Sequence, residues 1–99
     1  MRPLRLLLTA SEVTPFAKTG GLADVTAGLA RYLGSVGHDV RVVLPYYKRI
    51  ADSALVTQPL AGAQQIDVRF PNRTIRFSVR TAALPQSQVP VLFVVCFYV

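Results

Sequence analysis

The chain has 99 residues, of which 52% are apolar and 16% are charged, and its net charge is +6. This length allows one small domain, and the apolar content excludes an intrinsically disordered chain. The excess of positive charge points to an anionic partner, which could be nucleic acid, an anionic membrane or a phosphorylated small molecule. The 11 basic residues are spread along the chain without a run, so we expect no nucleic-acid partner.

The two apolar ends do not have the form of export or membrane segments. The first run is interrupted at Thr9, Ser11 and Glu12, too early for a signal peptide. The run 89–99 has about half of the roughly 20 residues that a membrane helix needs. The single cysteine, Cys96, excludes an internal disulfide. We therefore expect a cytoplasmic protein with no membrane partner.

The first half of the chain predicts a strand, a loop, a helix and a strand. Residues 4–10 are an apolar run typical of a strand buried on both faces, and 14–21 have loop composition. From residue 22 a helix is predicted, capped by Thr19 and ended by Gly34 or Gly37. Its core-facing stripe recurs every three or four residues, at Leu22, Val25, Leu29, Leu33 and Val36. With a second buried strand at 40–44, this describes a right-handed βαβ unit.

The second half predicts a short helix within 46–56, a linker at 58–65 and a β-hairpin at 66–80. A four-residue turn at 71–74 would place Arg69 opposite Arg76, with Arg80 on the same polar face. After a loop at 82–88, residues 89–99 predict a last buried strand in which Cys96 is inert core. The expected fold class is α/β, a partial Rossmann-like domain made of a βαβ unit, a hairpin and a final buried strand.

The loop at 14–21 has the parts of an anion site. Gly20 and Gly21 let the backbone approach a ligand closely and lead into a helix, whose free N–H groups favour phosphate oxygens. Lys18 adds a full positive charge. Neither the dinucleotide fingerprint nor the P-loop pattern is present, so physical reasoning alone leaves an ordinary tight turn open.

Residues 11–25, read together, carry a resemblance to a known family. This stretch, SEVTPFAKTGGLADV, resembles the N-terminal signature of bacterial glycogen synthases and plant starch synthases, and its most specific part is Lys18-Thr19-Gly20-Gly21-Leu22. The stretch 37–45, GHDVRVVLP, resembles the second strand of that family. The similarity is best over residues 4–49. It implies that residues 1–99 are a truncated N-terminal part of the catalytic region.

The resemblance implies a retaining glucosyltransferase that extends an α-1,4-glucan from ADP-glucose, with two Rossmann-like domains that face a cleft. It implies substrate-binding roles for Glu12, Lys18, Thr19, Gly20, Gly21 and Asp24. Lys18 would neutralise the donor diphosphate, the glycines would contact phosphate or sugar, and Asp24 would lie near the sugar. No residue of this chain is assigned as catalytic. No metal or cofactor is implied, since ADP-glucose is a substrate, and the expected location is the bacterial cytoplasm rather than a plastid.

Several of these residues also have purely structural interpretations. Glu12 could bind a sugar hydroxyl or brace the loop, and Asp24 is favoured by the helix dipole in any case. Tyr46 and Tyr47 could stack on glucan rings or pack in the core, and His38 is expected to be structural.

The apolar end of the sequence and its length suggest a truncated or frameshifted reading frame. We therefore expect the chain to lack activity without a C-terminal domain. The alternative function is a non-catalytic module that binds an anion or a glucan.

Overall fold

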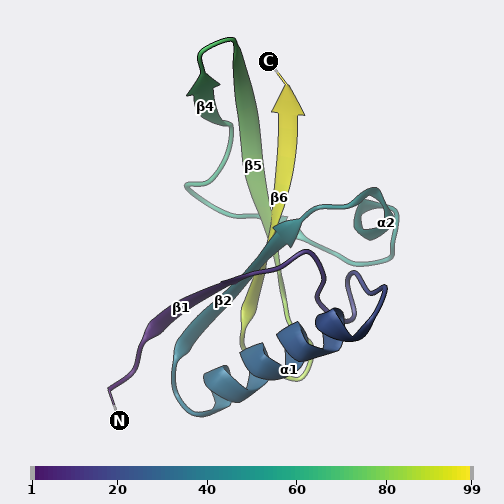
Figure 1. The fold of residues 1–99 in the computed structure, drawn as a ribbon, viewed down its shortest axis with the longest axis vertical. Coiled ribbons are helices and arrows are strands. Elements are labelled where there is room, and N and C mark those ends of the chain that lie inside the picture. Colours follow the sequence, from purple (N-terminus) through teal and green to yellow (C-terminus); the bar gives the residue numbers. More distant parts are fainter. Residues whose placement is uncertain (1, 99) are drawn as a thin grey trace.

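The computed structural model describes residues 2–98. Its elements in chain order are β1 (Arg5–Thr9), α1 (Gly21–Ser35), β2 (Asp39–Pro45), α2 (Lys48–Ala51), β3 (Gln58–Pro59), β4 (Ile66–Phe70), β5 (Arg73–Ala83) and β6 (Pro90–Tyr98). Figure 1 shows α1 lying along the β1–β2 part of a single twisted sheet. Among the described residues, no helix has the length and apolar character needed to cross a membrane.

The sheet has the order β1-β2-β6-β5-β3, with β4 paired to the outer part of β5. β1 and β6 both run parallel to β2, whereas β5 runs antiparallel to β6. The last strand of the chain therefore lies in the middle of the sheet, and Val91 and Phe93 on it are fully buried. The predicted α/β class, with its βαβ unit, hairpin and final buried strand, is confirmed.

Helix α1 begins and ends close to the predicted positions, but its cap differs. Gly20, in an extended conformation, is the N-cap residue, and no side chain caps the helix, so the prediction of Thr19 as cap is wrong. Gly37 has a φ of +103°, the left-handed conformation that commonly follows a helix. The prediction that glycine ends this helix is thus confirmed at Gly37.

The face that α1 turns to the sheet differs from the predicted one, although Leu33 of the predicted stripe does pack against the core. Leu22, Val25 and Leu29 are 53%, 64% and 46% exposed. The helix instead buries a stripe of small residues, Ala23, Thr26, Ala27 and Ala30. Small side chains let the helix backbone approach the sheet closely, and a Cβ added to Gly34 would lie 3.0 Å from Val89 Cγ2. Periodicity showed the larger stripe correctly, but it could not show that this stripe points away from the sheet.

Strand β1 is an edge strand, which corrects the prediction that it is buried on both faces. Its residues alternate between exposed and half-buried. Leu6 and Leu8 pack against the core, while Leu7 on the other face is 60% exposed. Within the described chain, β2 is its one neighbour in the sheet.

The β4–β5 hairpin forms with a different register from the predicted one. Phe70 pairs with Arg73, so the turn is two residues long, and Arg76 lies opposite Asp67 rather than Arg69. Arg76 Nε donates to Asp67 Oδ1 at 2.8 Å, and this bond lowers the pKa of Asp67 and raises that of Arg76. The shorter turn therefore replaces a like-charge pair by an ion pair.

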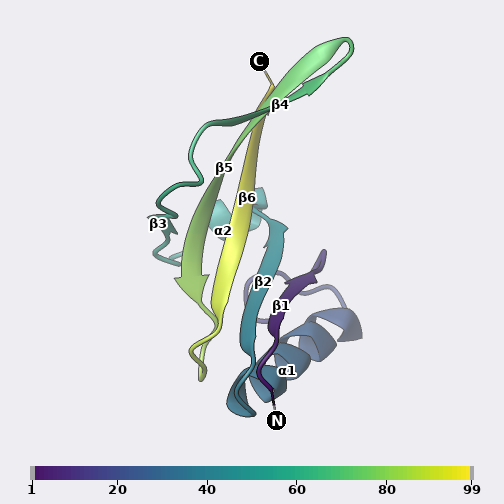
Figure 2. The same ribbon diagram turned by 90° about the vertical axis from the view of Figure 1, so that its left-hand side faces the viewer.

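The hairpin and the end of β6 project away from the body that α1 covers (Figures 1 and 2). Cys96 lies in this projecting part and is exposed, so the prediction that it is core is wrong. Arg80 is not on an open polar face, because its guanidinium donates to the hydroxyl and carbonyl oxygens of Thr57 at 2.6 and 2.9 Å. Val99, the last residue of the predicted final strand, lies outside the described residues.

Candidate functional site

The loop between β1 and α1 is attached to the core by its own buried side chains. Val13 and Ala17 exchange backbone hydrogen bonds of 3.0 Å, and their side chains are almost fully buried. Phe16 packs edge-on against Phe93 of β6, with 5.3 Å between ring centroids. Because these three residues anchor the loop in the core, the following residues 18–21 are held on the surface at the carboxyl end of β1.

The segment after β2 braces the same loop. Tyr47 donates its hydroxyl proton to the carbonyl oxygen of Ser11 at 2.8 Å, and the Tyr46 ring lies 5.7 Å from that of Phe93. Both tyrosines are thus engaged in packing, the structural alternative named above. Next to them, an open hollow with a volume of about 470 Å³ lies where β1 and β2 end beside the middle of β6, lined by residues such as Ser11, Pro45 and Val94.

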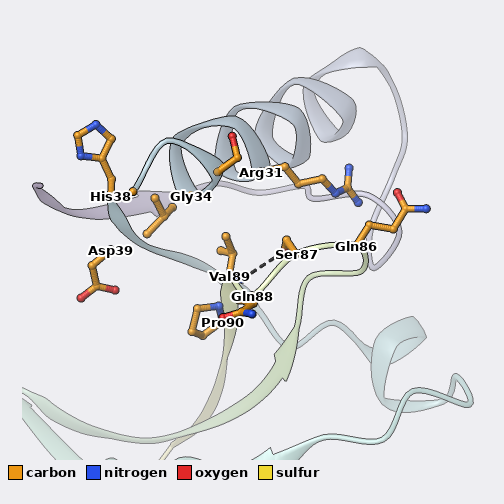
Figure 3. A pocket seen from close by; sticks show the side chains of 12 residues that line it. Arg31, Gly34, His38, Asp39, Gln86, Ser87, Gln88, Val89 and Pro90 are labelled. Carbon is orange, nitrogen blue, oxygen red and sulfur yellow. Dashed lines mark hydrogen bonds between the residues drawn. The ribbon is translucent and has the colours of Figure 1, made fainter. Parts of the chain in front are cut away.

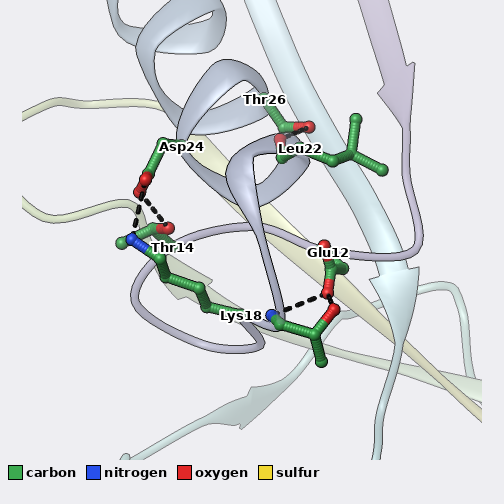
Figure 4. A network of polar contacts seen from close by, with 7 residues as sticks. Glu12, Thr14, Lys18, Leu22, Asp24 and Thr26 are labelled. Carbon is green, nitrogen blue, oxygen red and sulfur yellow. Dashed lines mark hydrogen bonds and ion pairs between the residues drawn. The ribbon is translucent and has the colours of Figure 1, made fainter.

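Lys18 and Asp24 lie close together at the N-terminal end of α1 (Figure 4). Lys18 Nζ lies 2.7 Å from Asp24 Oδ2, and Thr14 donates its hydroxyl proton to Asp24 Oδ1, also at 2.7 Å. The bond from Lys18, followed by that from Thr14, lowers the pKa of the Asp24 carboxyl. An ammonium has three N–H donors, so the pairing with Asp24 orients Lys18 and leaves donors for an anion.

Glu12, which lies away from Asp24 on the other side of the loop (Figure 4), pairs with Thr19. One carboxylate oxygen of Glu12 accepts hydrogen bonds from the backbone N–H of Thr19, at 2.7 Å, and from its hydroxyl group. Glu12 therefore braces the loop in this structure. Thr19 uses its backbone N–H and its hydroxyl group on Glu12, so this pair fixes the chain next to Lys18.

Gly20 and Gly21 are open to solvent. A Cβ added to either glycine would meet no atom of the chain within 4 Å. The φ of Gly20, −165°, is one that any residue adopts. Neither crowding within the chain nor backbone strain therefore requires Gly20 to be glycine, whereas close approach of a ligand to the backbone would.

Four of the six predicted residues thus form two hydrogen-bonded pairs, Lys18–Asp24 and Glu12–Thr19, and the glycine pair lies between Thr19 and Asp24 in sequence. Sequence reasoning missed the part of Thr14, which fixes Asp24. It also missed the support of the loop by Phe16 and Phe93. A threonine ten residues before a carboxylate gives no signal by itself, and the aromatic contact joins residues 77 positions apart.

A second hollow, of about 440 Å³, lies at the opposite ends of the strands, where β2 and β6 begin, between the end of α1 and the loop before β6 (Figure 3). Two of its side chains bind backbone groups. Arg31 Nε donates to the carbonyl oxygen of Pro85 at 3.0 Å, and His38 Nδ1 accepts from the N–H of Leu4 at 3.0 Å. The structural role predicted for His38 agrees with this contact.

The fold and the loop together define the class of protein. A parallel βαβ unit with an open, lysine-bearing glycine loop at the carboxyl end of β1 is the arrangement with which Rossmann-like domains bind phosphate groups. Residues 5–99 match the family described as starch synthase catalytic domain. The chain belongs to this family, which confirms the resemblance found in its sequence.

Curated relatives and a solved structure agree with this assignment. Glycogen synthase 1 of Geobacter sulfurreducens is 43% identical over 93 residues, which are 94% of this chain and 18% of the relative. Glycogen synthase of Geotalea uraniireducens is 62% identical over 47 residues, 48% of this chain and 10% of the relative. The catalytic domain of starch synthase IV from Arabidopsis thaliana, bound to ADP and acarbose, has a TM-score of 0.78 and 28% identity, over 94% of this chain and 18% of that one. The chain therefore spans less than a fifth of these relatives.

Proposed function

We propose that this chain is the donor-phosphate-binding part of a retaining glucosyltransferase that transfers glucose from ADP-glucose to an α-1,4-glucan. The observation that carries the proposal is the open glycine pair at the N-terminal end of α1, beside the Lys18 ammonium group that Asp24 orients. The family assignment supports it, as does the relative solved with ADP and acarbose bound.

Lys18 would act by electrostatic stabilisation of the leaving group. When the bond between the glucose C1 and the diphosphate oxygen breaks, negative charge develops on the departing ADP. C1 forms a new bond to a hydroxyl oxygen of the glucan, and the proton of that hydroxyl passes to the departing diphosphate. An ammonium held in place before the reaction stabilises this charge without reorganisation. Asp24, itself bound by Thr14, holds it there, and the N–H groups of Gly20 and Gly21 would face the phosphate oxygens.

The remaining part of such an enzyme would supply most of the nucleotide pocket and the acceptor site. We therefore expect negligible glucose transfer by the purified chain, in agreement with the small share of each relative that it spans. We propose that the enzyme acts in the cytoplasm of a bacterium, since the relatives named above include bacterial glycogen synthases.

The test is a chimera in which this chain replaces the 93 matched residues of the Geobacter sulfurreducens glycogen synthase 1. Lys18→Ala should lower kcat with ADP-glucose about 100- to 1000-fold, the usual loss for one donor that stabilises developing charge. Lys48→Ala is the matched control, because Lys48 pairs with Asp52 on the surface as Lys18 pairs with Asp24. Equal rates for the two variants would remove Lys18 from the reaction. UDP-glucose, run in parallel, tests the choice of donor.

Binding by the isolated chain separates the alternative function from the proposed one. Titration with glycogen should show no binding if the glucan site needs the part of the relatives that this chain does not span. Saturable glycogen binding by the isolated chain, together with an inactive chimera, would favour a non-catalytic glucan-binding module.

A further inference from the structure

The hollow where β2 and β6 begin lies apart from the candidate donor site, which is at the carboxyl end of β1. Its volume of about 440 Å³ falls within the range of about 300–1,000 Å³ that is usual for small-molecule sites. Figure 3 shows Arg31 and Gln86 at one end of the hollow and His38 and Asp39 at the other, with Val89 between them. The two ends differ in chemistry, and together they define the kind of ligand that the hollow accepts.

Arg31 gives the first end a positive charge that no carboxylate of residues 2–98 neutralises. The four ion pairs of the described residues do not include it. Its Nε donates to the carbonyl oxygen of Pro85 at 3.0 Å, which fixes the plane of the guanidinium group. A guanidinium group has five N–H donors, and this is the one hydrogen bond that Arg31 makes within the described part of the chain. The remaining donors are therefore available, in a fixed orientation, to an oxyanion in the hollow.

Gln86 follows Pro85 and stands at the same end in a strained conformation. Its φ is +60°, in the left-handed region that is unfavourable for residues other than glycine. The loop that carries it is closed by a hydrogen bond of 2.9 Å from the N–H of Leu84 to the carbonyl oxygen of Val89. Glycine would adopt this conformation without strain, and strained residues of this kind cluster at ligand sites. The Gln86 amide group makes no hydrogen bond within residues 2–98 and lines the hollow, where it can bind a ligand.

The other end offers one donor and one acceptor. His38 Nδ1 accepts a hydrogen bond from the N–H of Leu4 at 3.0 Å, so the neutral ring carries its proton on Nε2 and donates from there. The carboxylate of Asp39 lies 3.8 Å from Arg41 Nε, too far for a hydrogen bond, so it keeps its capacity to accept one. A hydroxyl group both donates and accepts and suits this pair, whereas Asp39 would repel a second anionic group.

We propose that the hollow binds a small hydroxylated oxyanion, which is either a sugar phosphate or a sugar acid. Arg31 and Gln86 bind its phosphate or carboxylate group. His38 and Asp39 bind its hydroxyl groups, and the apolar wall at Val89 packs against its carbon atoms. A nucleotide is disfavoured, because no phenylalanine or tyrosine is among the described residues that line the hollow and could stack on a base. The proposal does not rest on the donor-binding role proposed above, since the two sites lie at opposite ends of the strands.

Amide NMR of the isotope-labelled 99-residue chain, titrated with sorbitol 6-phosphate and with gluconate, tests the proposal. At least one of these probes should bind with a Kd below about 1 mM and should shift the amide signals of residues 86–89 and the Nε signal of Arg31. Tighter binding of sorbitol 6-phosphate identifies the ligand class as sugar phosphates, and tighter binding of gluconate identifies it as sugar acids. Sorbitol, which has no charged group, and inorganic phosphate, which has no hydroxylated carbon chain, should each bind at least about tenfold more weakly than the better probe.

A matched pair of substitutions assigns the binding to the hollow. Arg31→Met and Arg69→Met each remove one positive charge, and Arg69 lies far from the hollow on the projecting strand β4. Arg31→Met should weaken binding of the better probe at least about tenfold, whereas Arg69→Met should leave it unchanged. Gln86→Gly removes the amide group and suits a φ of +60°, so the variant should still fold. It should weaken binding about three- to tenfold.

Failure of the parent chain to bind either probe with a Kd below about 10 mM would overturn the proposal. Equal affinities of Arg31→Met and Arg69→Met would overturn it too, as would sorbitol or inorganic phosphate that binds as tightly as the better probe. If Arg31→Met does not fold, an unchanged affinity in Gln86→Gly overturns the proposal in its place. A probe that shifts only the amide signals of residues 18–21 binds at the candidate donor site, which overturns this proposal and leaves the donor-binding role intact. If the 99-residue chain is insoluble, the same probes and variants are measured by calorimetry on the chimera described above, with its donor site saturated by ADP.

Discussion

Phe93 is the residue on which the candidate site rests most directly. It is fully buried in the central strand β6 and contacts Phe16 from the loop after β1 and Tyr46 from the segment after β2. The replacement Phe93→Leu keeps an apolar side chain but removes both aromatic contacts. We expect it to destabilise the whole chain and to loosen the loop in particular.

The magnitude follows from these contacts. Each aromatic pair contributes about 0.5–1.5 kcal/mol beyond its buried area, so the loss of two costs about 1–3 kcal/mol. The smaller side chain also leaves a small cavity, which brings the expected loss to about 2–4 kcal/mol. A domain of this size is stable by about 5–15 kcal/mol, so the variant should still fold.

Urea unfolding measures the global loss, and amide hydrogen exchange measures the local one. Val91→Ala is the control, because Val91 is equally buried on the same strand but belongs to neither aromatic pair. Relative to the amides of β2, the Ala17 amide should exchange its hydrogen faster in Phe93→Leu, but not in Val91→Ala. A loss of global stability below about 1 kcal/mol, or equal relative protection of Ala17 in both variants, would refute the reasoning.

Three further predictions concern single residues. The pKa of Asp24 should lie below its model-peptide value of 3.8 and should rise in Lys18→Met but not in Lys48→Met, as followed by carboxyl NMR. Because the folded-state pKa is the lower one, the contribution of this pair to stability should be present above about pH 4 and be lost as the pH falls through the folded pKa; a contribution that grows on acidification would contradict the assignment. Gly37→Ala should destabilise the chain by about 1–2 kcal/mol in urea unfolding, since a φ of +103° is strained for alanine, and an unchanged midpoint would argue against that conformation. Cys96 should react with a maleimide in the absence of denaturant, whereas a reaction that requires denaturant would mean that Cys96 is covered.

Local patterns in the sequence predict the order of the elements except for β3, which lies in the predicted linker 58–65. The change of period after residue 21 and the glycine at 37 place α1 within a residue or two, and the alternation at 66–80 predicts the hairpin. The two-residue turn escaped prediction, because proline and asparagine suit turns of several lengths. Pairing Arg76 with Asp67 instead of Arg69 depends on the cross-strand register, which local composition does not determine.

The orientation of α1 and the support of the loop were beyond sequence reasoning for a different reason. An amphipathic pattern predicts that a stripe is covered, but not whether the sheet of the same segment or another part of a protein covers it. The small residues Ala23, Ala27 and Ala30 form an equally regular stripe that carries a weaker hydrophobic signal, and this one packs on the sheet. The motif located the candidate site, whereas its internal contacts, such as that of Thr14 with Asp24, required coordinates.

The place of β6 in the sheet has a consequence for synthesis on the ribosome. Strand β2 pairs with β6 across a gap of about fifty residues, as in the pair Val42–Val91, so the strand at the centre of the described sheet is translated after its neighbours β2 and β5. Until β6 leaves the exit tunnel, β2 and β5 have no partner between them, and their apolar side chains stay exposed in the nascent chain. Pairing over such sequence distances is slow and prone to aggregation, so nascent chains of this family should depend on chaperones until β6 has emerged.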